Sequence, residues 1–409
     1  MRVHRYRLPL AILVAALAAG GATLLLRPRS GLIKPAAANA SDYFTPQQLK
    51  RARDFRGPQR ALAVGSLALT GGVLLLLVIR PPRRIRRALE RAGARPIAGS
   101  AGAGAVYAIG MTAIGLPLAA IAEQRARDVG LSTQDWGSWL GDIGKSTAIG
   151  AVMTGAGAAI AVGMIRRFPR RWWLPGAAAI VALSTLLVFA SPVVIDPLFN
   201  KFEPLPDGRL RSEVLALADK ADVDVGQVYR VDASRRTTAT NAYVWGIGKT
   251  KRVVLYDTLI KDVPDDQVRA VVSHELSHVV HKDVPRGLLW LAIVAPAGTL
   301  VIKVLAERWN RERSLGLPAG LPALALAAAL TSTVLGSASN VLSRQVEARA
   351  DAYGLGLTHD PAAFIGLEQS LAVTNLADPS TPKVFQIVFG THPTTMQRIG
   401  MGLAWAREH

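Results

Sequence analysis

Long apolar runs without a charged residue dominate the pattern of this chain. Seven of them have about the 20 residues that cross a bilayer core of roughly 30 Å as a helix, so the chain is predicted to be a polytopic membrane protein with seven transmembrane helices. The runs are Leu8–Leu26, Ala61–Ile79, Ile97–Ala122, Thr147–Ile165, Trp172–Ile195, Gly287–Ile302 and Leu317–Val341.

The first run also resembles a secretory signal, because a basic start precedes it and small residues follow at Ala36–Ala40. Its apolar part is longer than that of a typical signal, and Arg27, Arg29 and Lys34 separate it from any cleavage position. We therefore interpret it as a retained membrane helix.

A polar stretch, Asp196–Arg286, lies between the fifth and sixth runs and is long enough for a small domain. After its opening residues Asp196–Leu205, a short amphipathic helix is expected, with Leu210, Val214, Leu217 and Ala221 at helical spacing. Three strand-like runs follow, Val228–Val231, Ala242–Trp245 and Val253–Tyr256, which predict a small β-sheet. Gly248-Lys249-Thr250 resembles the end of a phosphate-binding loop, but Tyr243 occupies the position that needs glycine, so we expect a hairpin turn there.

Composition excludes some classes of function. The net charge is +19, but many arginines flank the apolar runs instead of forming a stripe on a soluble domain, which argues for membrane lipid as a partner and against nucleic acid. The chain has no cysteine, so neither a disulfide framework nor a cysteine metal site is available.

The strongest chemical signal is His274-Glu275-Leu276-Ser277-His278. Two histidines four residues apart project from one face of a helix, where both reach one metal ion, and the adjacent glutamate is placed to take a proton from water. Pro264 and the following acids predict the start of this helix, and Pro285 its end. The alternative is an exposed helix face that happens to carry histidines.

A catalytic zinc needs three protein ligands and an open position. His281 is on the same face, but it lies about 10.5 Å along the axis from His274, too far for a shared ion on a straight helix. The glycine turn that solves this problem in longer motifs is absent, because His281 and Val284 occupy the relevant positions. The third ligand must therefore come from another element.

Glu347 is the best candidate, because the seventh run continues as a helix through Ser343–Gly354 and places Asp351 on the same face. Asp351 would then accept a hydrogen bond from a ligand histidine. The alternative is a solvated acidic pair balanced by Arg344 and Arg349. A further helix is expected at Ala362–Leu376. From residue chemistry alone, His392 is expected to be a surface or loop residue. Arg398 is expected to be a charge on a helix surface.

Several motifs together resemble the integral-membrane zinc metallopeptidases of the type I CAAX prenyl endopeptidases, which have HtpX-like proteases as relatives. They are D-P-L-F-N-K-F-E-P-L from Asp196, N-A-Y-V-W-G-I-G-K-T-K-R-V-V-L-Y-D-T-L-I from Asn241, H-E-L-S-H-V-V-H-K-D from His274, S-R-Q-V-E-A-R-A-D-A-Y from Ser343 and T-H-P-T-T-M-Q-R from Thr391.

The resemblance implies a fold: mainly α, with seven transmembrane helices around a chamber, and a gluzincin-type zinc metalloprotease domain with the HExxH motif and a small β-sheet. It implies that one Zn²⁺ per chain is held by His274, His278 and Glu347, with Asp351 bonded to a ligand. We accordingly divide the chain into residues 1–195 with five spans, 196–286 as catalytic domain, 287–341 with two spans, and 342–409 completing the metal site.

It further implies an endopeptidase in which Glu275 is the general base, while His392 and Arg398 stabilise the tetrahedral oxyanion or orient the substrate. Asn241, Ala242 and Tyr243 would belong to an edge strand on which an extended substrate lies. The expected partner is a peptide or protein, with lipidated and membrane-associated substrates both candidates. Processing of prenylated CAAX tails and quality control of membrane proteins are not distinguished by these residues.

The expected location is the cell membrane, but the side of the catalytic domain stays open. Family members are drawn with the zinc site facing the cytoplasm. Here Met1–Arg7, Arg80–Pro96 and Arg166–Arg171 are basic and fall on one side, so the positive-inside rule favours the opposite side for Asp196–Arg286. Arg27–Arg60 is basic as well and weakens that inference.

Two other classes of function are disfavoured. A transporter or channel needs ionisable residues within its spans, and the seven runs have no charged residue. A catalytically inactive scaffold would be expected to lack one of His274, Glu275, His278 or Glu347, and all four are present.

Overall fold

A computed structural model describes residues 3–246, 251–310 and 315–409 of the chain. Within these ranges seven helices are long and apolar enough to cross a membrane, which confirms the expected number. They are α1 (Val3–Leu26), α2 (Pro46–Ile79), α4 (Pro96–Asp128), α5 (Trp136–Arg167), α6 (Trp173–Val194), α10 (Asp283–Trp309) and α11 (Leu321–Thr358). A short basic helix, α3 (Arg83–Ala92), links α2 to α4.

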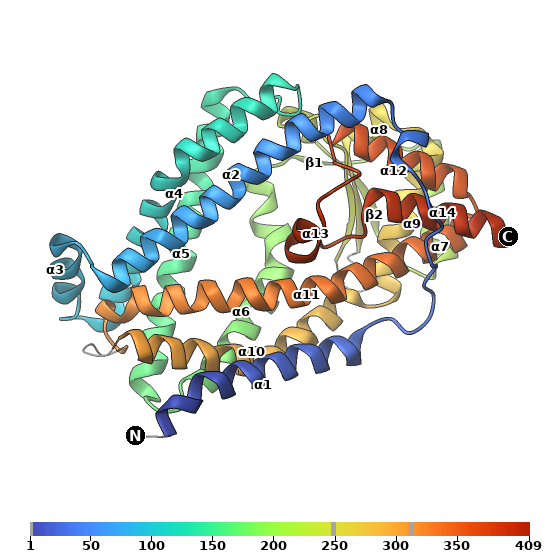
Figure 1. Cartoon of the computed structure of the whole chain (residues 1–409). Helices are drawn as coiled ribbons and strands as arrows, with labels where there is room; N and C mark the ends of the chain where they lie inside the picture. The colour runs from blue at the N-terminus through green and yellow to red at the C-terminus, as the bar shows by residue number, and fades with distance from the viewer. Residues whose placement is uncertain (1–2, 247–250, 311–314) are drawn as a thin grey trace.

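The spans separate into two groups, with α6 packed against α10 and α2 in contact with α11 (Figure 1). Helices α1, α10 and α11 lie side by side, and α2, α4 and α5 form the other group. Small residues of α1, Ala11, Ala15, Ala19 and Ala22, are buried against α10 and α11, so the backbones approach closely, as is typical of helix pairs in lipid. The first run therefore packs as one of the seven helices.

The polar stretch folds into a four-stranded sheet with the order β1-β2-β4-β3. Its strands are β1 (Phe202–Pro204), β2 (Gln227–Val231), β3 (Ala242–Trp245) and β4 (Arg252–Tyr256). Strands β2 and β4 are parallel, and the two outer pairs are antiparallel. The three expected strands are confirmed, whereas β1 was not predicted. The expected turn at Gly248-Lys249-Thr250 lies outside the described residues.

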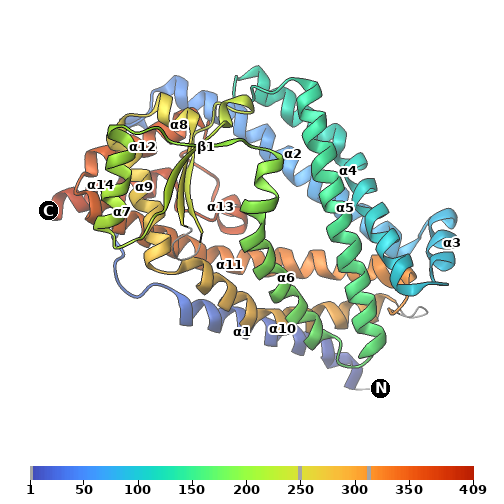
Figure 2. The ribbon, with the colours of Figure 1, turned by 180° about the vertical axis from the view of Figure 1, so that it is seen from behind.

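The sheet packs on helices α7 (Arg209–Lys220) and α9 (Asp265–Val280) around an apolar core (Figure 2). Val214, Val228, Val253, Val272 and Leu276 are completely buried in it. The short helix α8 (Asp257–Asp262) connects β4 to α9. The expected amphipathic helix is thus α7, and the expected histidine-bearing helix is α9.

The structure corrects the expected end of α9. The helix stops at Val280, because Lys282 adopts a left-handed conformation with φ of 54°, and α10 begins at Asp283. Pro285 therefore lies in the first turn of α10, where its missing N–H costs nothing, instead of terminating α9. This tight turn places Asp283 next to the end of α9.

Three helices after α11 complete the fold: α12 (Pro361–Thr374), α13 (Lys383–Phe389) and α14 (Thr395–Glu408). Helix α12 corresponds to the helix expected over Ala362–Leu376, and Asp360 caps it by accepting from the N–H of Ala363. Thr394 and Gln397 form a capping box that begins α14. Both helices pack on each other, and α12 contacts α9.

Candidate metal centre

Helix α9 brings His274, Glu275 and His278 together. Their ligand atoms all lie within 4.8 Å of one another. The opposite face of the helix is anchored by the buried side chains of Val268, Val272 and Leu276, so the three polar residues have a fixed direction. His274 is buried, and His278 has 22% of its side chain exposed.

Helix α11 crosses α9 at Gly354, where close approach requires glycine. A Cβ at Gly354 would lie 3.0 Å from Ser273 Oγ and 3.3 Å from the His274 nitrogen. The crossing places Glu347 Oε2 3.1 Å from His274 Nε2 and 3.8 Å from His278 Nε2. The carboxylate that sequence spacing suggested as third ligand thus faces both helix histidines.

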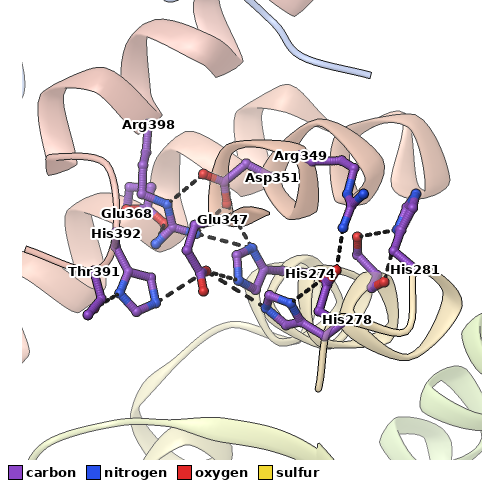
Figure 3. Close-up of polar contacts among 12 residues, drawn as sticks. His274, His278, His281, Glu347, Arg349, Asp351, Glu368, Thr391, His392 and Arg398 are labelled. Atoms are coloured by element: carbon purple, nitrogen blue, oxygen red, sulfur yellow. Dashed lines mark hydrogen bonds and ion pairs between the residues drawn. The ribbon is translucent and has the colours of Figure 1, made fainter. Parts of the chain in front are cut away.

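A third imidazole reaches the same carboxylate. His392 lies on the segment between α13 and α14, and its Nε2 is 3.2 Å from Glu347 Oε2. Its side chain is 55% exposed, so it borders the open side of the cluster. Figure 3 shows the three rings converging on Glu347 from two directions.

Each helix histidine is held from behind by a carboxylate. His274 Nδ1 is 2.8 Å from Asp351 Oδ1, as expected from the spacing of Glu347 and Asp351. His278 Nδ1 is 3.0 Å from Asp283 Oδ2, a contact that was not predicted. Carboxylates at Nδ1 fix that nitrogen as a donor and hold each ring so that its Nε2 is turned toward Glu347.

Further charges lie behind Asp351. Arg398 Nε donates to Asp351 Oδ2 at 2.9 Å, and its Nη2 donates to Asp351 Oδ1. Arg398 Nη1 is 2.7 Å from Glu368 Oε1, an ion pair between a residue of α14 and one of α12. All three nitrogens of this guanidinium therefore face carboxylates, which fixes the position of Asp351.

The surroundings favour a positive charge between the carboxylates. Burial opposes protonation of His274, but hydrogen bonds to Asp351 and Glu347 raise its pKa to about 10. A site that stabilises a proton at Nε2 to this extent also suits a cation bound at the same atom. For Glu275 the effect of burial has the opposite sign: burial raises the pKa of this carboxyl group, which makes its carboxylate a stronger base.

Residues that the sequence analysis set aside or offered as alternatives lie elsewhere. His281 does not face the cluster: its Nδ1 is 2.9 Å from the Ser277 carbonyl oxygen, and its ring packs on Tyr353. Arg344 donates to backbone carbonyls at Gln386 and Gly390, and Arg349 donates to Asp283. Neither arginine balances the Glu347–Asp351 pair, so the solvated-pair alternative does not describe this structure.

Strand β3 contacts α9 and is the edge of the sheet next to the cluster. Tyr256 N–H donates to the carbonyl of Asn241, and Tyr243 lies opposite Val254 in the antiparallel register. Since pairing alternates along an antiparallel strand, the backbone groups of Ala242 and Val244 point to the free edge.

Sequence reasoning missed three charged residues around the site, Asp283, Arg349 and Glu368. Asp283 lies within the quoted His274–Asp283 motif, but its role depends on the left-handed turn at Lys282. Glu368 had a weaker signal, as a single acid within the apolar helix α12. Arg349 gave no sequence signal, because an arginine between two acidic residues is expected only to balance their charge.

The chain matches two family models. The model described as peptidase family M48 matches residues 204–403, and the model described as CAAX prenyl protease N-terminal, five membrane helices, matches residues 36–201. The uncharacterized metalloprotease YhfN of Bacillus subtilis is 34% identical over 90% of this chain and 88% of its own length.

Two further relatives extend the comparison. A CAAX prenyl protease 1 homolog of Oryza sativa subsp. japonica is 33% identical over 53% of this chain and 52% of its own length. The crystal structure of S. mikatae Ste24p has the same fold, with a TM-score of 0.78 over 96% of this chain and 98% of that one, at 19% identity. The chain therefore belongs to peptidase family M48 and is an integral-membrane zinc metalloendopeptidase.

Proposed function

We propose that one zinc ion is held by His274 Nε2, His278 Nε2 and Glu347, and that the bound ion serves peptide hydrolysis by this chain. The supporting observation is the convergence of both Nε2 atoms on Glu347 while carboxylates hold both Nδ1 atoms. Two imidazoles and one carboxylate are a donor set of catalytic zinc sites with an open position.

Zinc at this position would supply Lewis-acid polarisation and lower the pKa of water. Glu275, half-buried beside the two histidines, accepts the proton of the attacking water and returns it to the leaving amine. His392 is exposed at the open side and donates to the developing oxyanion of the scissile carbonyl. Arg398 contributes indirectly, since its guanidinium holds Asp351 and through it His274.

The peptide substrate is proposed to add to the sheet at β3 as an extended strand. The free backbone groups of Ala242 and Val244 would pair with it, while Asn241 and Tyr243 contribute side chains. The relatives named CAAX prenyl proteases favour a prenylated carboxyl-terminal segment as substrate. The alternative is an HtpX-like protease that degrades misfolded membrane proteins.

Metal content and cleavage measured together test this proposal. Purified wild type and Glu275→Gln are compared for bound zinc and for cleavage of a prenylated CAAX peptide and of an unfolded protein. Both variants should retain about one zinc per chain. Glu275→Gln should lose roughly 100- to 10,000-fold in rate, the usual contribution of a general base.

The preferred substrate separates the two protease hypotheses. Freshly prepared wild type without bound metal would refute the zinc site. A Glu275→Gln variant as active as wild type would instead refute the assignment of the base, while leaving the metal site intact.

The strand-addition proposal has its own test in Val244→Pro, which removes one N–H from the free edge. Proline is tolerated on an edge strand whose N–H faces outward. The loss of one hydrogen bond of about 1 kcal/mol should lower kcat/KM for a peptide by roughly fivefold, with zinc content unchanged. Unaltered kcat/KM would show that substrate does not pair at this edge.

A further inference from the structure

A pocket lies at the carboxyl-terminal end of α9, away from His392. It has a volume of about 540 Å³ and is formed where α1 ends, α9 ends and α10 begins. Arg27, Arg29, Arg286 and Arg349 line it together with His281 and Tyr353, and the lining includes no acidic residue from the described part of the chain. Figure 3 shows Arg349 and His281 beyond His278, at the far end of the cluster from His392.

Of the four arginines in this pocket, Arg349 is the one with an acidic partner among the described residues, Asp283. In the ranges that the structure describes, Arg27, Arg29 and Arg286 form no ion pair with an acidic side chain. Only 6% of the surface of Arg349 is exposed, and its Nε has no hydrogen-bond partner among the described residues. A buried donor without a partner is costly, so the pocket is suited to an anion with several acceptor oxygens.

The pocket lies at the boundary of the membrane spans. The first span ends at Leu26, and the sixth begins at Asp283. Directly beside the arginines, Leu24, Leu25 and Leu289 are exposed by 58%, 60% and 49%. Arginines at the end of an exposed apolar helix surface match a molecule with an anionic head and hydrocarbon chains.

We propose that this pocket binds the phosphate of an anionic phospholipid, with its acyl chains along Leu25 and Leu289. Arg349 then connects the lipid to the metal centre, because its Nη2 donates to Asp283 Oδ1 and Asp283 Oδ2 contacts His278 Nδ1. The lipid thereby fixes Arg349, and Arg349 fixes the carboxylate that orients His278. Binding is independent of the proposed function, whereas this connection rests on the proposed zinc site.

Native mass spectrometry of detergent-purified protein tests binding directly. Wild type is mixed with phosphatidylglycerol and phosphatidylcholine and compared with Arg27→Gln/Arg29→Gln/Arg286→Gln. The matched control is Arg83→Gln/Arg84→Gln/Arg87→Gln, which removes the same charge from exposed positions of α3.

Wild type and control should retain one phosphatidylglycerol in preference to phosphatidylcholine. The pocket variant should bind it roughly 100-fold more weakly, from about a fivefold loss per arginine removed. Equal retention by the pocket variant and the control would overturn the proposal. So would displacement of the lipid by inorganic phosphate at matching concentration, since the site would then recognise free phosphate.

The connection to the metal centre is tested by zinc release, without any measurement of cleavage. Phosphatidylglycerol should slow the loss of zinc from wild type to a chelator severalfold, because loss of an outer carboxylate contact typically weakens metal binding 10- to 100-fold. The pocket variant should release zinc at a rate that lipid does not change. Lipid binding without any effect on zinc release in wild type would refute the connection while retaining the binding site.

Discussion

The two histidines of α9 are supported in different ways. His274 has 6% of its side chain exposed, and behind it Asp351, Arg398 and Glu368 form a buried group from three separate helices. His278 has 22% of its side chain exposed and is supported by Asp283 and Arg349, next to the arginine-lined pocket. We call these groups the inner support and the outer support.

The difference indicates two separate controls on one site. The inner support ties α9 and α11 to α12 and α14, so its charges belong to the folding of the carboxyl-terminal helices. The outer support lies at the membrane boundary, beside the arginine-lined pocket. Removing a charge from either support breaks a buried ion pair and should lower stability. The loss of stability should be larger for the inner support, and the outer support should act more on the metal.

The largest effect is expected from Asp351→Ala. Breaking a buried ion pair by removing one partner costs about 3–5 kcal/mol, because the other charge stays buried without full compensation. Thermal unfolding in detergent should show a strongly lowered Tm, whereas Asp219→Ala, an exposed position on α7, should leave Tm unchanged. An unchanged Tm for Asp351→Ala would contradict the role of the inner support.

A smaller effect, and one of a different kind, is expected from Asp283→Asn. The amide keeps the shape of the side chain but removes the charge that orients His278, so zinc affinity should fall roughly 10- to 100-fold. Competition with a chelator measures this change. Tm of the metal-free protein should fall less than for Asp351→Ala, and the reverse order would remove the distinction between the two supports.

The smallest effect is expected in the pH dependence of stability, for which wild type is compared with Glu368→Gln. Burial raises the pKa of Glu368 to about 7, above its value in an unfolded chain. Its contribution to stability is therefore complete below about pH 4.5 and is lost as pH rises through 7. Between pH 5 and 7 the free energy of unfolding of wild type should decline relative to Glu368→Gln by up to about 2 kcal/mol. Parallel pH profiles of Tm would show that Glu368 does not titrate in this range.

Much of the fold could be predicted because its signals are local. Apolar length identifies the spans, and histidine spacing identifies the face of α9 that carries His274 and His278. Strand β1 was missed, because a run of three residues, Phe202–Pro204, has no periodicity of its own and is defined only by pairing with β2. The end of α9 was misplaced for a similar reason, since a left-handed Lys282 is not a sequence signal.

The sequence by itself determined the helices, the pairing of His274 with His278 on one face, and the pairing of Glu347 with Asp351 on another, since each depends on spacing within one helix. Only the tertiary structure decided which charges support each histidine. Asp283, Arg349, Glu368 and Arg398 reach the site from separate elements, and their contacts follow from the crossing of α9 and α11 at Gly354 and the packing of α12 and α14. Spacing along a chain carries no information on such contacts, because they are fixed by how the apolar faces of different helices are buried against one another.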